Sequence, residues 1–592
     1  MCGIAGYIGT KVAQPILLDT LARLEYRGYD SCGIAVRGSP LTICKGTTRV
    51  SKLKLQSPEL SGTVGIGHTR WATHGEVSEA NAHPQTDCRH KIAVVHNGVI
   101  SNFHELRRIL VAEGHIFKSQ TDTEVLPHLI EKFYDGDLEH AVRQALSLVE
   151  GTYAILVVTE YENKMVAARN GSPMIIGIGH DGFVVASDVP AIVNYATKVI
   201  YLEDGDLALM DNQDLRITNG STIVHRTAYD FKIDVETLGK KGFEHYMLKE
   251  ICEQPQVVRS SLQIYRNQPG FTDKPVLNLE TDSLTITACG TSYHAALIGK
   301  FVIEELTGIP VRVEVASEIS YRPNIVKTSK VIGVSQSGET ADVLTSLKRM
   351  KAAGVETIAI TNAFQSTISR VADHTIYTPA GHEVAVAATK TFVAQVVALI
   401  KLALSHPKVS RDIRDRLDTE LDLIPQKIQR IIDNKIQIEH YASFLSGVEQ
   451  IFFIAKGVNV PIAFEGALKA KEIGYINAEA FCAGELKHGP FALLTPASMV
   501  VIIAPRDENH SSISTTVQEI KARKAKVICV VEEEDDTFDD SVENILKIPS
   551  TERLLSPILY AVALQLLAYY IAKTRGCPID FPRNLAKSVT VE

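Results

Sequence analysis

The sequence lacks the motifs that mark metalloenzymes and nucleotide-binding enzymes. Its nine cysteines include no C-x-x-C pair, and neither an H-E-x-x-H motif nor a G-x-x-x-x-G-K-S/T loop occurs. We therefore expect no metal ion, no cofactor and no disulfide framework. The formal net charge is −8, and no basic patch with interleaved aromatic residues is present, so the sequence argues against a nucleic-acid partner.

Little in the sequence suggests a membrane protein or a secreted protein. The most apolar segment, residues 557–572, is short for a membrane span and contains Gln565. We interpret it as a buried helix, with Ser556 as N-cap and Pro557 at the first helical position. The start of the chain resembles a short strand rather than a signal peptide, so we expect a cytoplasmic protein with no membrane partner. A length of 592 residues predicts roughly three or four domains.

The chain begins Met1-Cys2-Gly3-Ile4, and removal of Met1 would leave a thiol and a free α-amine on Cys2. Their reference pKa values are about 8.5 and about 8, so the neutral amine can take the thiol proton near neutral pH. A nucleophile of this kind needs no separate histidine base. The alternative is a cysteine that merely stands near a chain end, and these four residues alone do not decide between the two.

Three short clusters follow, and each has a purely structural interpretation. They are residues 68–75, which hold the only tryptophan of the chain, residues 93–98 and residues 121–124. The first can be a surface Arg-Trp stack. The second can be an apolar strand that ends in an Asn-Gly turn, and the third can be the cap of a helix that begins near residue 124.

The same clusters also contain the groups that hydrolysis of an amino acid amide needs. The side-chain amide of Asn97 and the backbone N–H of Gly98 can form an oxyanion hole. The guanidinium of Arg70 suits the carboxylate of a free amino acid, and the carboxylate of Asp122 suits its ammonium.

Taken together and in order, the motifs of the first half resemble the class II, N-terminal-nucleophile glutamine amidotransferase domain over residues 2 to about 225. The motifs are MCGI, LEYRGYDS, HTRWATHG, NAHP, HNG and TDTE. The resemblance implies an αββα sandwich of the Ntn-hydrolase type. It also implies a glutamine site formed by Arg70, Trp71, Thr73, His74 and Asp122.

One apparent dinucleotide motif in this half has another explanation. Residues 177–182 match G-x-G-x-x-G, but they join two strand-like runs, and no helix follows. A dinucleotide site needs a strand, a loop and then a helix, so we predict a β-hairpin here.

The second half begins after a polar stretch, residues 229–250, which we interpret as a linker. From there, strands and helices alternate in the manner of a parallel α/β sheet. Residues 335–340, S-Q-S-G-E-T, follow a predicted strand and precede a predicted helix. Such a loop can bind a phosphate at the helix N-terminus. A serine-rich helix cap is the alternative.

The pattern then recurs, with residues 451–457 and the helix after them paralleling residues 284–290 and their helix. Two tandem sugar-isomerase (SIS) domains, each a flavodoxin-like α/β sandwich, resemble this pattern, with a helical stretch at about 405–445 between them. We predict an amidotransferase domain at 1–228, a linker at 229–250, and SIS domains at 251–425 and 426–592, the second ending in a catalytic tail.

The motifs CGTS, SQSGET, EVAVAATKTF, EGALKAKEI, AGELKHGP and DFPRNLAKSVTVE resemble the isomerase half of the glutamine–fructose-6-phosphate aminotransferase family. With the first half, the resemblance spans essentially the whole chain. It implies that fructose 6-phosphate and glutamine are converted to glucosamine 6-phosphate and glutamate, the first committed step of amino sugar synthesis. Ammonia would pass internally between two sites.

The family resemblance also implies roles for individual residues. Lys587 would form a Schiff base, Glu472 would move a proton between C1 and C2, and His488 would open the sugar ring from the neighbouring subunit of a homodimer. The catalytic residues implied are Cys2, Asn97, Gly98, Lys469, Glu472, His488 and Lys587. The sugar-phosphate-binding residues implied are Ser292, Ser335, Gln336, Ser337, Thr340, Val386 and Ala586.

Three residues depart from the family pattern, and other families offer rival interpretations. The departures are Ala388, Gly474 and Asn477, which leave the catalytic groups unchanged. An amidotransferase acting on phosphoribosyl pyrophosphate would need a pyrophosphate loop, and an asparagine synthetase would need an ATP pyrophosphatase loop; the sequence has neither. A sugar-phosphate-sensing regulator would keep the phosphate loop but has no need of Cys2, His488 and Lys587 together.

Overall fold

The computed structural model describes residues 2–72, 74–231, 239–267, 271, 276–278, 280–319, 321–322 and 328–590. The chain divides into two compact units. The first unit comprises Met1–Gly239 and the tail Ala586–Glu592, and the second comprises Lys240–Leu585.

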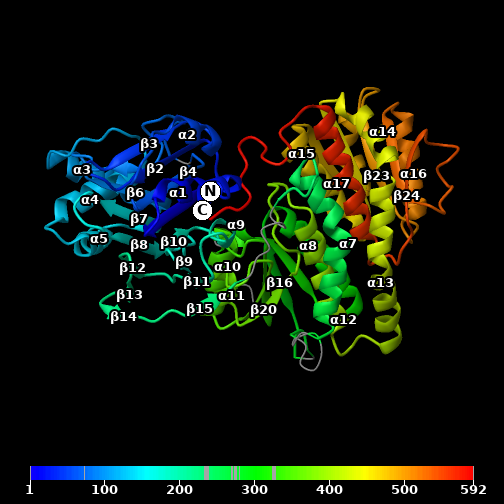
Figure 1. Ribbon diagram of the computed structural model, residues 1–592. Coiled ribbons are helices and arrows are strands. Elements are labelled where there is room, and N and C mark those ends of the chain that lie inside the picture. Colours follow the sequence, from blue (N-terminus) through cyan, green and yellow to red (C-terminus); the bar gives the residue numbers. More distant parts are fainter. Residues whose placement is uncertain are drawn as a thin grey trace. The chain divides into compact units, whose positions relative to one another are not determined.

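The first unit contains two large sheets covered by helices on their outer faces (Figure 1). One sheet has the order β15 (Ala228–Asp230), β11 (Lys198–Tyr201), β9 (Ile175–Gly179), β10 (Gly182–Ala186), β1 (Gly3–Gly9), β4 (Val64–Arg70), β2 (Ser31–Val36) and β3 (Thr42–Gly46). The other has the order β14 (Thr222–Ile223), β13 (Leu215–Asn219), β12 (Asp206–Met210), β8 (Met165–Asn170), β7 (Gly151–Thr159), β6 (Ile92–Ile100) and β5 (Gln85–Thr86).

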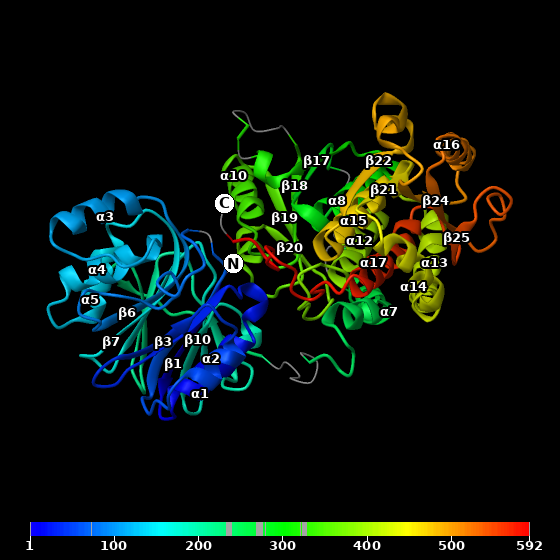
Figure 2. The ribbon, with the colours of Figure 1, turned by 90° about the horizontal axis from the view of Figure 1, so that it is seen from above.

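The helices of this unit complete a four-layer arrangement. They are α1 (Ala13–Ala22), α2 (Val50–Gln56), α3 (Phe103–Ala112), α4 (Val125–Phe133) and α5 (Leu138–Leu146), with short 3-10 turns η1 (Glu25–Arg27), η2 (Asp122–Glu124) and η3 (Val189–Ala191). Figure 2 shows α3, α4 and α5 outside β6 and β7, and α1 and α2 on the other side of the sandwich. The predicted αββα fold is confirmed.

Strand β6 shows why the sequence of this sandwich is so apolar. Ala93 and Val95 belong to the core between the two sheets, whereas Val94 belongs to the core under the helices. Successive strand residues point to opposite faces, and both faces of this strand are buried. A continuous apolar run therefore marks a central strand here, rather than an alternating pattern.

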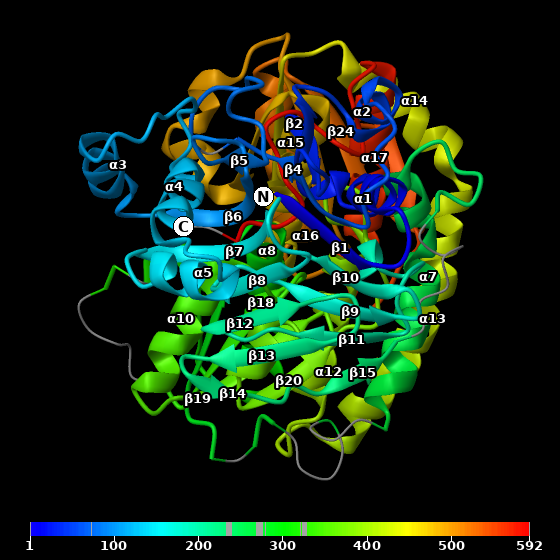
Figure 3. The same cartoon turned by 60° about the vertical axis from the view of Figure 1, so that its left-hand side comes forward.

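The hairpin predicted at residues 177–182 is confirmed. Strands β9 and β10 pair antiparallel, and Gly179 lies opposite Gly182 in their register. Figure 3 shows β9, β10 and β11 as neighbouring strands of one sheet, with no helix between β9 and β10.

The second unit contains two parallel sheets with the same strand order, which confirms the predicted tandem repeat. The first has the order β17 (Val311–Val315), β16 (Leu284–Ala288), β18 (Lys330–Ser335), β19 (Glu356–Thr361) and β20 (His374–Tyr377). The second has the order β22 (Asn477–Cys482), β21 (Gln450–Ala455), β23 (Met499–Ala504), β24 (Lys526–Glu532) and β25 (Asn544–Ile548). Each has the flavodoxin-like order, in which the second strand in sequence lies at one edge.

Helices cover both sheets and connect the two copies. In the first copy they are α7 (Tyr246–Tyr265), α8 (Gly290–Thr307), α9 (Ala316–Ile319), α10 (Ala341–Ala352), α11 (Thr367–Val371) and α12 (Lys390–Leu404). The connection is formed by α13 (Arg411–Asp433) and α14 (Lys435–Ser446), so the boundary predicted after residue 425 lies inside α13. In the second copy they are α15 (Val460–Gly474), α16 (His510–Ala522) and α17 (Ser556–Thr574), with η4 (Gly457–Asn459), η5 (Ala483–His488) and η6 (Pro490–Leu493).

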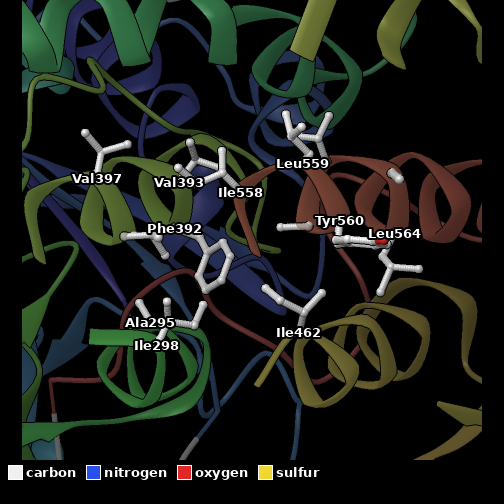
Figure 4. Packing of buried hydrophobic residues seen from close by; sticks show 14 of the residues in the cluster. Ala295, Ile298, Phe392, Val393, Val397, Ile462, Ile558, Leu559, Tyr560 and Leu564 are labelled. Atoms are coloured by element: carbon white, nitrogen blue, oxygen red, sulfur yellow. The ribbon is translucent and has the colours of Figure 1, made fainter. Parts of the chain in front are cut away.

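A shared apolar core joins the two copies. Helices α8 and α12 of the first copy face α15 and α17 of the second, and Figure 4 shows Phe392, Ile462 and Tyr560 within this core. Helix α17 is long and apolar enough to cross a membrane, but 89% of its apolar window is buried. It is thus the predicted buried helix. The predicted N-cap, Ser556, is wrong by one residue. Leu555 is the N-cap, and Ser556 is the first helical residue.

Candidate active sites

The first candidate site surrounds Cys2, which stands directly before the central strand β1. Because Gly3 pairs with Thr69 in the sheet, Cys2 lies beside Arg70 and Trp71 at the end of β4. The backbone N–H of Trp71 donates to the Cys2 sulfur over 3.3 Å. Burial raises the pKa of the Cys2 thiol, and the hydrogen bond from Trp71 opposes that rise.

One pocket brings most of the predicted residues of the first half together. Its lining residues are Cys2, Arg70, Trp71, His74, His83, His96, Asn97, Gly98, Thr121, Asp122, Thr123 and Thr590. No role was predicted from the sequence for the two histidines at 83 and 96 or for the three threonines. Thr73, for which a role was predicted, lies outside the described residues.

Asn97 and Gly98 lie inside β6 rather than in the turn after it. The side-chain nitrogen of Asn97 donates to the Cys2 carbonyl over 3.0 Å, and its oxygen lies 3.0 Å from His68 Nε2. Because this nitrogen carries two protons, one remains for an oxyanion. At Gly98, φ is +134°, and an added Cβ would lie 2.0 Å from the Thr152 carbonyl oxygen. The backbone here requires glycine.

His68 holds Asn97 in place, although it has no predicted role. Its Nε2 lies 3.0 Å from both the His96 carbonyl and the Asn97 amide oxygen, so this nitrogen carries the proton. Burial lowers the pKa of His68 to about 3, which keeps the ring neutral at physiological pH. A neutral His68 positions Asn97 without placing a cation beside the Cys2 pocket.

Arg70 is buried and supports the loop that follows it. Its guanidinium donates to the carbonyl of His74 and, over 3.4 Å each, to those of Gly75 and Glu76. Across the pocket, an oxygen of Asp122 accepts the backbone N–H of Ile100 over 2.9 Å. Both side chains line the pocket, as expected. Their roles in binding glutamine remain predictions.

The second candidate site is the loop between β18 and α10. Ser335 Oγ lies 2.9 Å from Thr340 Oγ1 and accepts the N–H of Gly338 over 3.0 Å, while Ser337 Oγ accepts the N–H of Glu339 over 3.2 Å. The loop follows the carboxyl end of a parallel strand and precedes a helix N-terminus. An anion is favoured at such a position.

Of the remaining sugar-site residues of the second unit, Gln336 belongs to the same loop, Ser292 lies on α8, and Val386 lies between β20 and α12. Gln336 is half-buried beside Ser335. The hydroxyl of Ser292, in the first turn of α8, accepts a hydrogen bond from Gln395 over 3.0 Å. Val386 is buried, and its N–H donates to the Asp580 carbonyl over 3.0 Å.

Lys469 and Glu472 form a buried charged cluster on α15. Lys469 Nζ lies 2.5 Å from Glu472, 3.3 Å from Glu465 and 3.0 Å from the hydroxyl of Thr291 on α8. The Lys469 side chain is only 1% exposed, so this is not a solvated ion pair. Burial lowers the pKa of Lys469, but the two carboxylates outweigh it and raise that pKa above its usual value.

Glu465 is a central member of this cluster. It stands in the EGALKAKEI motif, but no role was predicted for it. Its carboxylate accepts from Thr291 over 3.1 Å and lies 2.7 Å from His294 Nδ1. Burial opposes ionisation, yet the charge of Lys469 lowers the pKa of Glu465. The cluster therefore links α8 of the first SIS copy to α15 of the second.

We expect Lys469→Ala to destabilise the second unit by about 3–5 kcal/mol, because Glu465 would remain buried without its cationic partner. Lys471→Ala is the matched control, since Lys471 is exposed on the same helix and should change stability by less than about 0.5 kcal/mol. Hydrogen exchange of α15 peptides in increasing denaturant measures both. Equal effects of the two substitutions would contradict the assigned role of Lys469.

The other three predicted residues of the synthase site, His488, Ala586 and Lys587, lie outside α15. His488 is exposed at the end of η5. Ala586 and Lys587 are half-buried in the tail segment that groups with the first unit. Just before that segment, the N–H of Arg583 donates to the hydroxyl of Tyr475 over 2.7 Å.

Comparisons with known proteins agree with both halves of the chain. The model of the glutamine amidotransferase domain matches residues 68–194, and the SIS domain model matches residues 279–405 and 444–575. The glutamine–fructose-6-phosphate aminotransferase (isomerizing) of Caldanaerobacter subterraneus is 43% identical, with 100% of each chain covered. The chain belongs to the glutamine–fructose-6-phosphate aminotransferase family. The aminotransferase of Thermococcus kodakarensis is also 43% identical over 100% of both chains.

A solved structure supports the same family in the second half. The C-terminal domain of the glucosamine-fructose-6-phosphate aminotransferase from Francisella tularensis matches with a TM-score of 0.54 and 35% identity. It covers 58% of this chain and 100% of the solved chain. Membership of the family therefore rests on sequence similarity over the full length of the chain and on structural similarity over its SIS half.

Proposed function

We propose that this protein makes glucosamine 6-phosphate and glutamate from fructose 6-phosphate and glutamine. The observation that carries the proposal is the full-length similarity to relatives named for this reaction, at 43% identity. The pocket around Cys2 and the serine-rich loop of the first SIS copy supply the chemistry that the two substrates require.

The glutaminase reaction uses Cys2 as nucleophile. Once Met1 is removed, the α-amine takes the thiol proton, and the thiolate attacks the side-chain amide of glutamine. Asn97 and the N–H of Gly98 stabilise the oxyanion, and ammonia leaves as the thioester forms. Water then hydrolyses the thioester to glutamate. Arg70 and Asp122, with help from Trp71, Thr73 and His74, orient the amino acid.

The synthase reaction takes place on the open-chain sugar. Ser335, Gln336, Ser337 and Thr340 hold the phosphate, and Ser292, Val386 and Ala586 contact the sugar. Lys587 forms an imine at C2, which ammonia then displaces. Glu472 moves the proton from C1 to C2, and the ion pair with Lys469 holds the Glu472 side chain in position.

We also propose that the protein forms a homodimer and works in a reducing compartment. In one protomer, His488 is exposed at the end of η5, which suits a residue that completes the site of a second copy. All nine cysteines are unpaired, and a reactive thiol at Cys2 needs a reducing environment such as the cytoplasm.

The test is a coupled assay on the purified full chain. With glutamine and fructose 6-phosphate, we expect one glutamate for each glucosamine 6-phosphate. Glutamine hydrolysis without any amino sugar, in the presence of saturating fructose 6-phosphate, would contradict the proposal. So would an absolute requirement for ATP.

We expect Trp71→Ala to uncouple the two reactions, because ammonia must reach the sugar without loss to water. Trp71 lines the Cys2 pocket, while its contact with the Cys2 sulfur is made by its backbone N–H and would survive the substitution. Glutaminase activity should remain while glutamate exceeds amino sugar by several-fold. Tyr161→Ala, an exposed aromatic of the same unit, is the control. A ratio of glutamate to amino sugar that stays one-to-one would show that the Trp71 side chain only packs against its neighbours and does not couple the two reactions.

A further inference from the structure

Four side chains of the types that bind metal ions converge beside α4 in the first unit. Cys88, His115, His128 and Glu131 each offer one ligand atom, and these atoms all lie within 4.8 Å of one another. Cys88 follows β5 and His115 follows α3, while His128 and Glu131 stand one turn apart on α4. Helix α4 contacts both β5 and α3, and the three can be followed in Figure 3. None of the four residues lines the Cys2 pocket.

The distances between the four ligand atoms match those around a tetrahedrally coordinated metal ion. Cys88 Sγ lies 3.7 Å from His115 Nδ1 and 3.5 Å from His128 Nδ1. Glu131 Oε2 lies 3.1 Å from the first nitrogen and 3.5 Å from the second. Tetrahedral Zn²⁺, with bonds of about 2.3 Å to sulfur and about 2.0–2.1 Å to nitrogen and oxygen, places sulfur and nitrogen about 3.6 Å apart and nitrogen and oxygen about 3.4 Å apart.

Hydrogen bonds in which both histidines donate to Glu131 explain this cluster less well than a metal ion does. If both histidines donated from Nδ1 to Glu131, the other nitrogen of His128 would be a buried acceptor. That nitrogen has no hydrogen-bond partner among the described residues, and the side chain is 1% exposed. With a metal on Nδ1, the same nitrogen carries a proton and faces the Glu124 carboxylate, 3.8 Å away. A carboxylate behind a ligating histidine is the usual arrangement in metal sites.

We propose that Cys88, His115, His128 and Glu131 bind a structural Zn²⁺ or a similar divalent transition ion. One thiolate, two imidazoles and one carboxylate are ligands that Zn²⁺ accepts, and four protein ligands leave no open position for a substrate. Binding releases the proton of the Cys88 thiol and requires neutral imidazoles. The ion takes part in no chemical step at either active site. The proposal departs from the sequence-based expectation of no metal ion, because the four ligands come together only in the fold.

The ion fixes one wall of the glutamine pocket. It joins the segment after α3 to α4, and the chain between them carries Asp122 and Thr123 into the Cys2 pocket. Glu124 supports the same segment, because its carboxylate accepts the N–H groups of Lys118 and Ser119 over 2.6 and 2.7 Å. Loss of the ion should therefore loosen glutamine binding and lower the thermal stability of the first unit.

The test uses the full chain, stripped with a chelator and titrated with Co²⁺. We expect one equivalent to bind, with a thiolate-to-cobalt band in the near ultraviolet and the intense visible bands of a tetrahedral ion. Cys88→Ser should lose the thiolate band and bind more than about 100-fold more weakly. Cys44→Ser is the matched control, since Cys44 is another half-buried thiol of the first unit, outside the cluster. It should keep the band.

Glu131→Gln provides a second variant should Cys88→Ser fail to fold. In the wild type, Glu131 accepts the Cys88 N–H over 3.3 Å. The amide oxygen of the glutamine can still accept this N–H, but it is a poorer metal ligand than a carboxylate. We expect its Co²⁺ affinity to fall and its melting temperature to stop responding to chelator. The proposal is overturned if the stripped wild type shows no thiolate band at one equivalent of Co²⁺. It is equally overturned if Cys88→Ser keeps the band, or if Glu131→Gln binds Co²⁺ as tightly as the wild type.

Discussion

Replacing Cys2 with alanine is expected to abolish glutamine hydrolysis and glutamine-dependent amino sugar synthesis. Without the thiol, the pocket keeps Asn97, Gly98 and Arg70 but has no nucleophile. Loss of a covalent nucleophile typically lowers the rate by on the order of 10⁴-fold or more. The isomerisation of fructose 6-phosphate should survive, because its residues lie elsewhere in the chain.

The control for this substitution is Cys44→Ala. Cys44 lies on β3, does not line the Cys2 pocket and should leave both reactions within about twofold of the wild type. Mass spectrometry of the purified chain should also show that Met1 is absent. A chain that keeps Met1 and is fully active with glutamine would contradict the N-terminal mechanism.

Deleting the residues after Pro582 is expected to eliminate both amino sugar synthesis and isomerisation. The default for a chain end is a mobile extension. Here, Ser588 is buried and Thr590 lines the Cys2 pocket, so this tail is docked. A lysine in an ordered segment can be held at a carbonyl carbon, whereas one on a free tail cannot.

Borohydride trapping assigns the imine. With fructose 6-phosphate, the label should appear on Lys587, and Lys587→Ala should remove it. Lys469 is unsuitable as the nucleophile because Glu465 and Glu472 keep it protonated. Lys573→Ala changes an exposed lysine at the end of α17 and is the control. A label on Lys469, or synthesis by the truncated chain, would require that the role of Lys587 be withdrawn.

The elements of this fold follow largely from local sequence patterns. The tandem SIS copies could be predicted because each parallel strand is a short apolar run followed by a loop and a helix. The hairpin at residues 177–182 could be predicted from the absence of a following helix. The position of Asn97 and Gly98 inside β6 could not be predicted from the local sequence. The Thr152 carbonyl, which excludes a side chain at Gly98, belongs to the neighbouring strand β7.

The sites were less predictable than the fold wherever the partners come from distant elements. His68 acts through Asn97, and Glu465 acts through Lys469 and Thr291, so their roles depend on tertiary contacts. The ligands beside α4 come from three separate elements, so their spacing matches no metal motif. Chemistry in the sequence alone pointed to Cys2, Arg70, Asp122, the Asn97-Gly98 pair and the loop at residues 335–340.

The central claim is that one chain hydrolyses glutamine and delivers the ammonia to fructose 6-phosphate. The most direct measurement supplies glutamine labelled with ¹⁵N in its amide, together with fructose 6-phosphate and an excess of unlabelled ammonium. Mass spectrometry then gives the isotope content of the product. We expect glucosamine 6-phosphate that carries ¹⁵N almost completely, with one glutamate formed for each amino sugar. A product diluted to the isotope ratio of the bulk ammonium, or glutamate without amino sugar, would contradict the account.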